Sequence, residues 1–442
     1  MKRYEKYKPT GIQWLPEIPE HWNIESFGKH FSFGKGLPIT KADLTKEGIA
    51  VISYGQVHSK LNLGVTLSDS LIRYVSNRWL DTNPQNLLRK CDFVFADTSE
   101  DIAGAGNYAF NDYSKPLFAG YHIVIARPTM VENSRYWAYL FQSNCWKSQV
   151  QSLVNGVKVY SINKSILKKT AILIPSIAEQ EKIVAHLDKR ITLIENCKCQ
   201  RERELQTLNE LKQAEIASVV TQGLNPDVPM KDSGIPWIGQ IPVHWDMKYL
   251  FQVAHEHYIS NKDIHHQNLL SLSYGKIVHK DINTTEGLLP ASFDTYQIIE
   301  PGNIVFRFTD LQNDHKSLRV GLSKETGIIT SAYIAVEVDT IYILPEYFYY
   351  TLHSFDIKKL FYSMGGGLRQ SLNYNGIRKL YLPIPPLEEQ KAIVSFVDNK
   401  IKKIEVMIQS LESEIDRLTE YKQRLISDVV TGQIDVRGEQ IQ

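Results

Sequence analysis

Acidic and basic residues near the middle of the chain have a spacing that could bind a catalytic metal. Asp227 follows a proline, and Asp246 and Lys248 come about twenty residues later, as in metal-dependent nucleases that use two carboxylates and a lysine. Asp227 lies among Pro, Asp and Gly residues rather than after an apolar strand. A self-contained nuclease therefore stays open as an alternative, but we assign no catalytic residue and no metal ligand.

Other catalytic motifs are incomplete. The segment GKHFSFGKG at 28–36 lacks both the glycine spacing and the final hydroxyl residue of a phosphate-binding loop. Neither a G-x-G-x-x-G fingerprint nor an Asn-Pro-Pro-aromatic run that could hold a flipped base is present. His255, His257, His265 and His266 cluster without the four-ligand spacing of a zinc site, and we expect them to be exposed or hydrogen-bonded. We expect no cofactor or metal in this chain.

The composition excludes several classes of protein. The chain has 442 residues, 43% hydrophobic and 22% charged, which is enough for two or more domains. It lacks a run of apolar residues that could span a membrane or act as a signal sequence, so we expect a cytoplasmic protein. Four irregularly spaced cysteines predict reduced thiols rather than a disulfide framework.

The elements that would position any site occur twice, because the second half of the chain repeats motifs of the first in the same order. The offset between copies shrinks from 223 to 210 residues along the chain. The recurring pairs are Gly11–Trp22 with Gly234–Trp245, Ser53–Gly55 with Ser273–Gly275, Ser161–Asn163 with Ser371–Asn373, Ile174–Asp188 with Ile384–Asp398, and Val219–Thr221 with Val429–Thr431. Each half is thus a variable block followed by a shared block.

The shared blocks have the pattern of long helices. Apolar residues recur at steps of four and three in the second copy, which is a heptad seam interrupted by Lys422. The first copy places Lys198, Arg201, Lys212 and Glu215 in its seam, so its best partner is the second copy. The predicted seam residues are Leu187, Ile191, Ile194, Leu205 and Leu208 in the first copy, and Val397, Ile401, Ile404, Ile408, Leu411, Ile415, Leu418 and Leu425 in the second. We expect an intramolecular antiparallel coiled coil, about 50 Å long over 397–429.

The variable blocks mix short strands with a few helices, which predicts an α+β fold for each. Strands are expected at 49–53, 93–96, 121–126, 303–308 and 333–338, and helices at 134–153 and 344–362. The predicted organisation is a first globular domain at 1–175, a helical spacer and linker at 176–232, a second globular domain at 233–385 and a helical spacer at 386–442. An approximate twofold axis would relate the two halves.

The net charge of +1 conceals differences between these blocks. Residues 1–175 carry +7, residues 176–232 carry −2, residues 233–385 carry −1 and residues 386–442 carry −3. A basic first block fits a polyanionic partner, whereas the nearly neutral second block does not by itself indicate one.

With these motifs the chain resembles the DNA-specificity subunit of type I restriction-modification systems. The resemblance rests on the segment LPIPPLEEQ at 382–390, on YKQRLI at 421–426 with VTGQIDVR at 430–437, on their echoes in the first half, and on the paired Ile-Pro-x-His-Trp segments. The first copy departs from the pattern, since Ile174-Pro175-Ser176 lacks the double proline.

The resemblance implies a non-catalytic subunit. Each variable block would be a target recognition domain that reads one half of a bipartite, asymmetric site on double-stranded DNA, and the helices would set the gap between the halves. Two modification subunits would carry S-adenosylmethionine-dependent adenine methylation. Restriction subunits would supply the ATP- and Mg²⁺-dependent translocation and cleavage. A coiled-coil scaffold that binds only proteins remains an alternative.

Base edges and phosphates would be contacted by Lys, Arg, Asn and Gln side chains in loops near the repeated anchors. The candidates are Lys35, Lys41, Gln56, Lys158, Tyr160 and Asn163 in the first block, and Lys276, Arg307, Gln312, Arg369, Gln370 and Asn373 in the second. The glycine run before Arg369 could let backbone approach DNA closely. We expect Tyr54, Tyr274 and the four repeated tryptophans Trp14, Trp22, Trp237 and Trp245 to pack in the cores rather than stack on bases.

Overall fold

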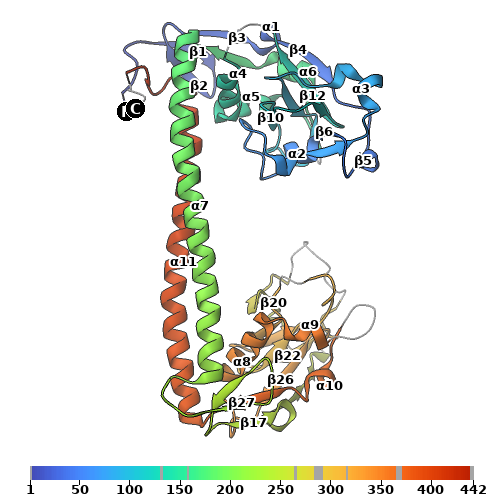
Figure 1. Cartoon of the computed structure of the whole chain (residues 1–442), viewed down its shortest axis with the longest axis vertical. Coiled ribbons are helices and arrows are strands. Elements are labelled where there is room, and N and C mark those ends of the chain that lie inside the picture. The colour runs from blue at the N-terminus through green and yellow to red at the C-terminus, as the bar shows by residue number, and fades with distance from the viewer. Residues whose placement is uncertain are drawn as a thin grey trace. The chain divides into compact units, whose positions relative to one another are not determined.

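The chain divides into two compact units in the computed structural model (Figure 1). Unit 1 comprises Met1–Arg201 with Ser413–Gln442, and unit 2 comprises Glu202–Glu412. The structure describes residues 2–129, 133–156, 159–262, 266–282, 292–314, 317–364 and 371–438. Each unit combines an α+β domain with one stretch of each of two long helices, which confirms the expected fold class. Within these ranges no helix is long and apolar enough to cross a membrane.

The domain of unit 1 is built on two four-stranded sheets, ordered β10-β8-β12-β4 and β11-β6-β7-β5. The first is antiparallel, and β11 runs parallel to β6. The pairs β1-β2, β13-β9 and β14-β3 complete the strands. The bounds are β1 Tyr7–Ile12, β2 Leu15–Pro19, β3 Asn23–Ser26, β4 Phe31–Lys35, β5 Leu44–Thr45, β6 Ile49–Ile52, β7 Arg73–Val75, β8 Phe93–Ala96, β9 Thr98–Ser99, β10 Tyr108–Phe110, β11 Leu117–Ala119, β12 Ile123–Pro128, β13 Tyr160–Ser161 and β14 Ala171–Ile174.

Helices pack on the strands of unit 1 through a core rich in aromatic rings, including Phe27, Phe31, Phe93, Phe141 and Trp146. The helices are α1 Phe27–His30, η1 Lys41–Asp43, α2 Tyr54–Val57, η2 Asp69–Leu71, α3 Trp79–Thr82, η3 Pro84–Asn86, α4 Ser134–Gln142, α5 Asn144–Leu153 and α6 Lys164–Lys169.

The domain of unit 2 has a four-stranded antiparallel sheet, β18-β26-β23-β24, a three-stranded sheet, β19-β22-β25, and the pairs β15-β16, β17-β27 and β20-β21. Its strands are β15 Met230–Asp232, β16 Gln240–Pro242, β17 Asp246–Tyr249, β18 Ala254–His257, β19 Ile259–Ser260, β20 Leu270–Ser273, β21 Lys276–His279, β22 Gln297–Ile299, β23 Ile304–Phe306, β24 Val320–Leu322, β25 Gly327–Ile329, β26 Ile334–Val338 and β27 Tyr381–Ile384. Its helices are η4 Leu250–Gln252, α8 Pro345–Ile357, α9 Leu360–Met364 and α10 Tyr374–Ile377.

Each helix predicted within a variable block is two helices. Ser143 interrupts the first, because its side chain accepts a hydrogen bond from the backbone of Trp146 and so caps α5. The second breaks between α8 and α9, where Lys359 has a φ of 60°. Apolar periodicity continues across both breaks, so it could not reveal them.

The two long helices are α7, Ile177–Gln222, and α11, Leu387–Val430. Both begin one or two residues after a proline, which suits a helix start. In each unit the two helices pair antiparallel, as in a coiled coil (Figure 1). All of the predicted seam residues are buried or partly buried, while the residues on either side of them are mostly more exposed.

Charged residues in the seam of α7 pair with α11 instead of breaking the coil. Arg201 lies 3.1 Å from Glu414 in unit 1, and Lys212 lies 2.7 Å from Glu405 in unit 2. Glu215 also lies 3.1 Å from Lys400. The seam that looked weak in the first copy is therefore complemented by the second.

The repeated motifs attach each domain to the helices. In unit 1, Glu179 on the first turn of α7 accepts a 2.6 Å hydrogen bond from the hydroxyl of Tyr4 and lies 3.0 Å from Nε2 of His21. In unit 2, Glu389 on α11 accepts from Nε1 of Trp245 at 3.1 Å and lies 2.8 Å from Nε2 of His244. The Ile-Pro-x-His-Trp and Glu-Gln repeats are thus two sides of one contact.

The glutamine that follows each of these glutamates performs a second structural role. Oε1 of Gln180 accepts from the backbone of Asn133 just before α4, and Oε1 of Gln390 accepts from the backbone of Leu344 just before α8. Both glutamines are fully buried. In each unit, the glutamine thus holds the start of a domain helix against a spacer helix.

Candidate nucleic-acid interface

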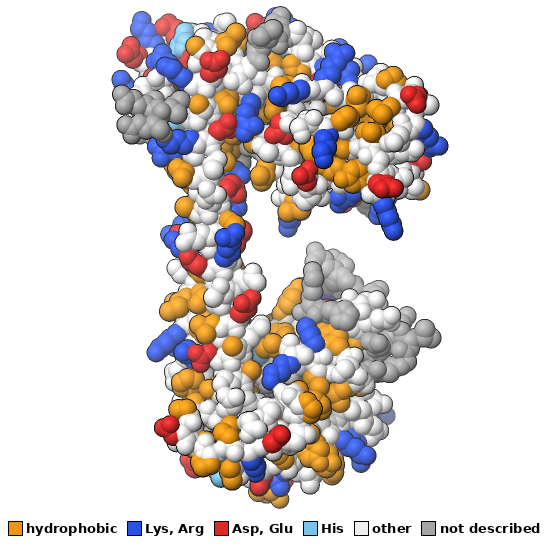
Figure 2. All heavy atoms as spheres, viewed as in Figure 1, with side chains coloured by type: hydrophobic (Ala, Val, Ile, Leu, Met, Phe, Trp, Pro, Cys, Tyr) orange, Lys and Arg blue, Asp and Glu red, His pale blue; other side chains and the backbone are white. Residues whose placement is uncertain are grey.

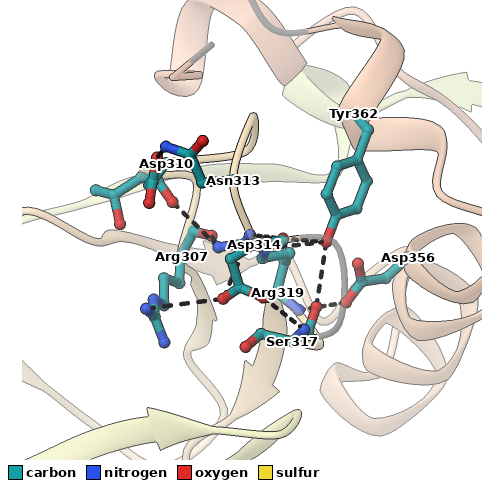
Figure 3. A network of polar contacts seen from close by, with 9 residues as sticks. Arg307, Asp310, Asn313, Asp314, Ser317, Arg319, Asp356 and Tyr362 are labelled. Atoms are coloured by element: carbon teal, nitrogen blue, oxygen red, sulfur yellow. Dashed lines mark hydrogen bonds and ion pairs between the residues drawn. The ribbon is translucent and has the colours of Figure 1, made fainter. Parts of the chain in front are cut away.

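A loop of unit 2 between β23 and β24 is held from beneath by the fully buried side chain of Arg319 (Figure 3). Its Nη1 donates to the backbone oxygens of Thr309 at 3.1 Å and Arg307 at 3.4 Å. Its Nη2 donates to the backbone oxygen of Asp314 and lies 3.6 Å from the Asp314 carboxylate. One side chain therefore fixes both ends of the loop that carries Gln312.

Tyr362 on α9 closes the same network from above. Its hydroxyl donates to the backbone oxygen of Asp314 at 3.0 Å and accepts from Nε of Arg319 at 3.3 Å. Within the loop, Asn313 donates to the Asp310 carboxylate at 2.7 Å, and Asp310 has a φ of 56°. A strained, heavily bonded loop of this kind is a rigid platform for exposed side chains.

Asp356 on α8 supports Arg319 through the backbone. One carboxylate oxygen of Asp356 accepts from the backbone N–H of Arg319, and the side chain is fully buried. Burial raises the pKa of Asp356 to about 6, against the opposing effect of the hydrogen bond and of nearby cations.

The structure brings three of the predicted residues of unit 2 to this region. Arg307 is partly exposed and lies 4.0 Å from Asp314, and Gln312 is an exposed residue of the loop. Lys276 is the first residue of β21, directly after a turn in which Gly275 lies against Leu318 of the same loop. Its ammonium group also lies 3.7 Å from Glu405.

Two predicted contact residues serve as helix caps. Oδ1 of Asn163 accepts from the backbone N–H groups of Ser165 and Ile166 at the start of α6, and Oδ1 of Asn373 accepts from Gly376 at the start of α10. The Ser-x-Asn repeat is therefore explained by capping. The side-chain oxygens are thus engaged by the caps, and the amide nitrogens can donate to a ligand.

In unit 1, aromatic and imidazole rings of α2 and its C-terminus gather against those of the segment between β11 and β12. The ring of Tyr54 lies 5.4 Å from that of His122, 5.6 Å from that of Tyr121 and 6.2 Å from that of His58, between centroids. Nε2 of His58 lies 2.8 Å from the backbone oxygen of Thr98 on β9. These rings form a partly exposed surface that combines stacking faces with hydrogen-bonding groups.

Predicted residues of unit 1 border this cluster. Gln56 is on α2 two residues after Tyr54, with its Oε1 engaged by the backbone N–H of Ser53. Tyr160 is on β13, which pairs with β9, and Lys35 pairs with Val124 near the start of β12. Lys41 is exposed in η1. Lys158, Arg369 and Gln370 lie outside the described residues.

The expectation for the repeated aromatic residues was partly wrong. Trp22 and Trp245 are fully buried, as expected, and Trp237 and Tyr54 are partly buried. Trp14 is 42% exposed, and Tyr274 is 75% exposed with a φ of 46°. Ser53-Tyr54-Gly55 begins a helix while Ser273-Tyr274-Gly275 forms a hairpin turn, so identical residues adopt different structures.

The residues of the alternative nuclease site come from two separate segments of unit 2. Asp246 and Lys248 are on β17, whereas Asp227 lies in the loop before β15. The exposed His255 and the buried His257 lie 3.6 and 3.4 Å from Glu337, and His265 lies outside the described residues. The described part of the chain holds no group of three His, Cys, Asp or Glu that could bind a metal ion.

Arg319 and Asp356, which hold the loop of unit 2, were missed in the sequence. Both look like ordinary charged residues near strand and helix ends. One signal in the sequence could have identified Arg319. It directly precedes the buried strand that begins at Val320, and a buried charge at that position requires partners.

Each unit thus joins an α+β domain to stretches of two antiparallel helices, and this architecture recurs in a solved structure. A chain from a solved structure concerning complex assembly and conformational transition of the type I restriction-modification system has the same fold, with a TM-score of 0.67 and 14% identity over 94% of this chain and 99% of that chain.

The chain belongs to the family of the type I restriction modification DNA specificity domain, whose model matches residues 20–207 and 320–417. It is 24% identical to a Methanocaldococcus jannaschii protein assigned provisionally as the MjaX specificity subunit of a type I restriction enzyme, over 98% of this chain and 97% of the relative. It is 20% identical to the MjaVIII specificity subunit of the same organism, over 95% of each chain. Membership in this family supports neither the nuclease nor the scaffold alternative.

Proposed function

We propose that each unit reads one half of a bipartite, asymmetric site on double-stranded DNA and that the chain itself catalyses no reaction. The observation that carries this proposal is that the two units share their attachment to the helices but differ in their loops. The same Glu–His and Gln contacts attach both domains to the helices. The loops that follow differ, with a ring cluster in unit 1 and an Arg319-anchored loop in unit 2.

The two domains would bind their DNA half-sites differently, because their net charges differ. Lys and Arg side chains are spread over the face of unit 1 seen in Figure 2, and its first 175 residues carry a net +7. Such a domain gains affinity from phosphate contacts. The nearly neutral domain of unit 2 would depend more on specific contacts from its rigid loop.

The paired helices would act as the ruler between the half-sites. Their antiparallel register is set by apolar and charged contacts in each unit. A helix pair is stiff compared with a peptide linker, so its length would fix the number of base pairs between the two contacts.

Two modification subunits would bind the chain and supply S-adenosylmethionine-dependent adenine methylation, and restriction subunits would supply ATP- and Mg²⁺-dependent cleavage in the cytoplasm. Apolar side chains exposed on the spacer helices, Leu193, Leu211, Phe396, Val406 and Met407, are candidates for that docking. They lie outside the predicted seam.

Methylation mapping tests the proposal. The chain is co-expressed with its modification subunits in a host without other adenine methylation, and methylated adenines are mapped by long-read sequencing. We expect one asymmetric, two-part motif, and replacing residues 1–175 with the matching domain of a relative should change one part only. Methylation without a motif, or a change in both parts, would contradict the assignment of one half to each unit.

A further inference from the structure

In the turn between β20 and β21 of unit 2, Tyr274 has a backbone conformation that tyrosine rarely adopts. Ser273 pairs with Lys276, so Tyr274 and Gly275 alone make the turn. Their φ angles are 46° and 78°. Positive φ at both central positions defines a type I′ turn, which favours Asn-Gly and disfavours a residue as large as tyrosine.

Packing within the domain does not explain the tyrosine. The side chain of Tyr274 is 75% exposed, and within the described ranges no residue stacks on its ring or hydrogen-bonds its hydroxyl. The ring is exposed to water, and asparagine would relieve the backbone strain at this position. The tyrosine therefore does not stabilise the isolated chain.

The turn is nevertheless held firmly in place. The hydroxyl of the partly buried Tyr349 on α8 donates to the backbone oxygen of Gly275 at 3.1 Å. A Cβ on Gly275 would lie 3.1 Å from Leu318, so the turn rests against the end of the anchored loop. An exposed ring on a strained but firmly held turn is the arrangement expected of a side chain that recognises a ligand.

The surroundings of the ring fit duplex DNA as the ligand. Lys276 lies two residues away and is exposed. Gln312 and Arg307 are on the loop that the turn contacts. Side chains of these types bind phosphates and base edges, and an aromatic ring beside them can pack on bases.

We propose that Tyr274 is a specificity-determining residue of unit 2, whose ring packs on the bases of the half-site that this unit reads. This inference rests on the proposed function. The cost of the strained turn would be offset when DNA binds, because the ring then leaves water.

The test compares three variants of the full chain, each assembled with its modification subunits. Tyr274→Asn removes the ring and suits the turn, Tyr274→Phe keeps the ring, and Tyr421→Ala removes an exposed tyrosine from α11 as a matched control. Sites are selected from a random-sequence duplex pool and sequenced, affinities for the winning duplex are measured by fluorescence anisotropy, and Tm is measured for each assembly.

We expect Tyr274→Asn to have a Tm at or above that of the wild type but to bind about 5- to 150-fold more weakly, the range for loss of one base-specific contact to duplex DNA. It should lose sequence preference in one half of the motif only. Tyr274→Phe and Tyr421→Ala should keep the affinity and the motif. Unchanged affinity and motif in Tyr274→Asn would overturn the inference while leaving the proposed function standing, whereas a wild-type assembly that selects no motif would overturn both.

Discussion

Nζ of Lys422 on α11 lies 2.7 Å from the carboxylate of Glu195 on α7, and the repeat equivalents of these residues, Lys212 and Glu405, make the same 2.7 Å contact in unit 2. The residue numbers of each pair add up to 617, so both contacts belong to a single antiparallel register. Lys422, which interrupts the apolar seam in the sequence, is therefore one half of a repeated ionic contact that specifies the register.

Reversing the charge at this contact should weaken the coil, and reversing both charges should restore it. We expect K422E to lower the free energy of unfolding by about 1 kcal/mol, because it places two carboxylates side by side at a partly buried site. The double variant K422E/E195K should recover most of that loss. A double-mutant cycle from urea unfolding measures the coupling.

The exposed pair Glu388–Lys391 provides the control, since both residues are on α11 and E388K breaks no contact between helices. A coupling energy between Lys422 and Glu195 no larger than that of the control pair would mean that the contact does not set the register.

Removing Glu179 should loosen the attachment of the first domain to α7. The carboxylate is buried and accepts from Tyr4, so E179A leaves the Tyr4 hydroxyl without its acceptor and should cost about 1–3 kcal/mol. E181A, two residues further along on the exposed face, should change stability by less than about 0.5 kcal/mol. Similar Tm values for the two variants would contradict the role given to the Glu-Gln repeat.

The raised pKa of Asp356 should make unit 2 less stable as pH rises. Burial holds the pKa of this carboxyl at about 6, above the ordinary value of 3.8, so between pH 4 and 6 the folded state binds more protons than the unfolded state. The stability contributed by protonated Asp356 is present below about pH 4 and is lost as pH rises through 6. The change is on the order of 3 kcal/mol.

The variant D356N removes this titration and keeps an oxygen that can accept from Arg319. The difference in unfolding free energy between D356N and wild type should therefore grow in favour of D356N from pH 4 to 7. Comparing the two proteins cancels other titrating groups, including His353, whose pKa burial lowers to about 4. A difference that is constant with pH would show that Asp356 titrates normally.

Truncating Arg319 should release the loop of unit 2. R319M leaves the backbone oxygens of Arg307 and Thr309 without a donor and should cost about 3 kcal/mol. Hydrogen exchange should increase at residues 309–314, and methylation should lose its preference in one half-site. K324M, a change of the same type at an exposed position of unit 2, should do neither.

The parts of the fold that were predictable are those whose pattern repeats over a long range. The heptad spacing locates α7 and α11 and their partnership, because a stripe of that length has few ways to be buried. The duplicated Glu179 and Glu389 could be matched to each other from the sequence. Their contacts with His21 and His244 could not, since pairing across more than 140 residues leaves no local signal.

Side-chain roles in the loops were the least predictable. Asn163 and Asn373 are of a residue type that can read bases. Each is followed by a helix, however, and its side chain caps that helix by accepting hydrogen bonds from the first N–H groups. Tyr274, like Tyr54, was expected to pack in a core rather than to stack on bases. Two-residue hairpin geometry at this copy, with positive φ at both positions, turns the ring outward instead.

The ruler is the central claim, and its most direct test lengthens both helices together. Duplicating residues 202–208 in α7 and residues 406–412 in α11 adds one heptad to each, about 10.5 Å of helix, or about three base pairs. A single duplication should disrupt the seam and lower Tm, whereas the matched pair should keep a Tm near the wild type. Mapped methylation in the matched variant should show both half-sites unchanged and the gap between them longer by about three base pairs. An active, stable matched variant with the original gap would contradict the account.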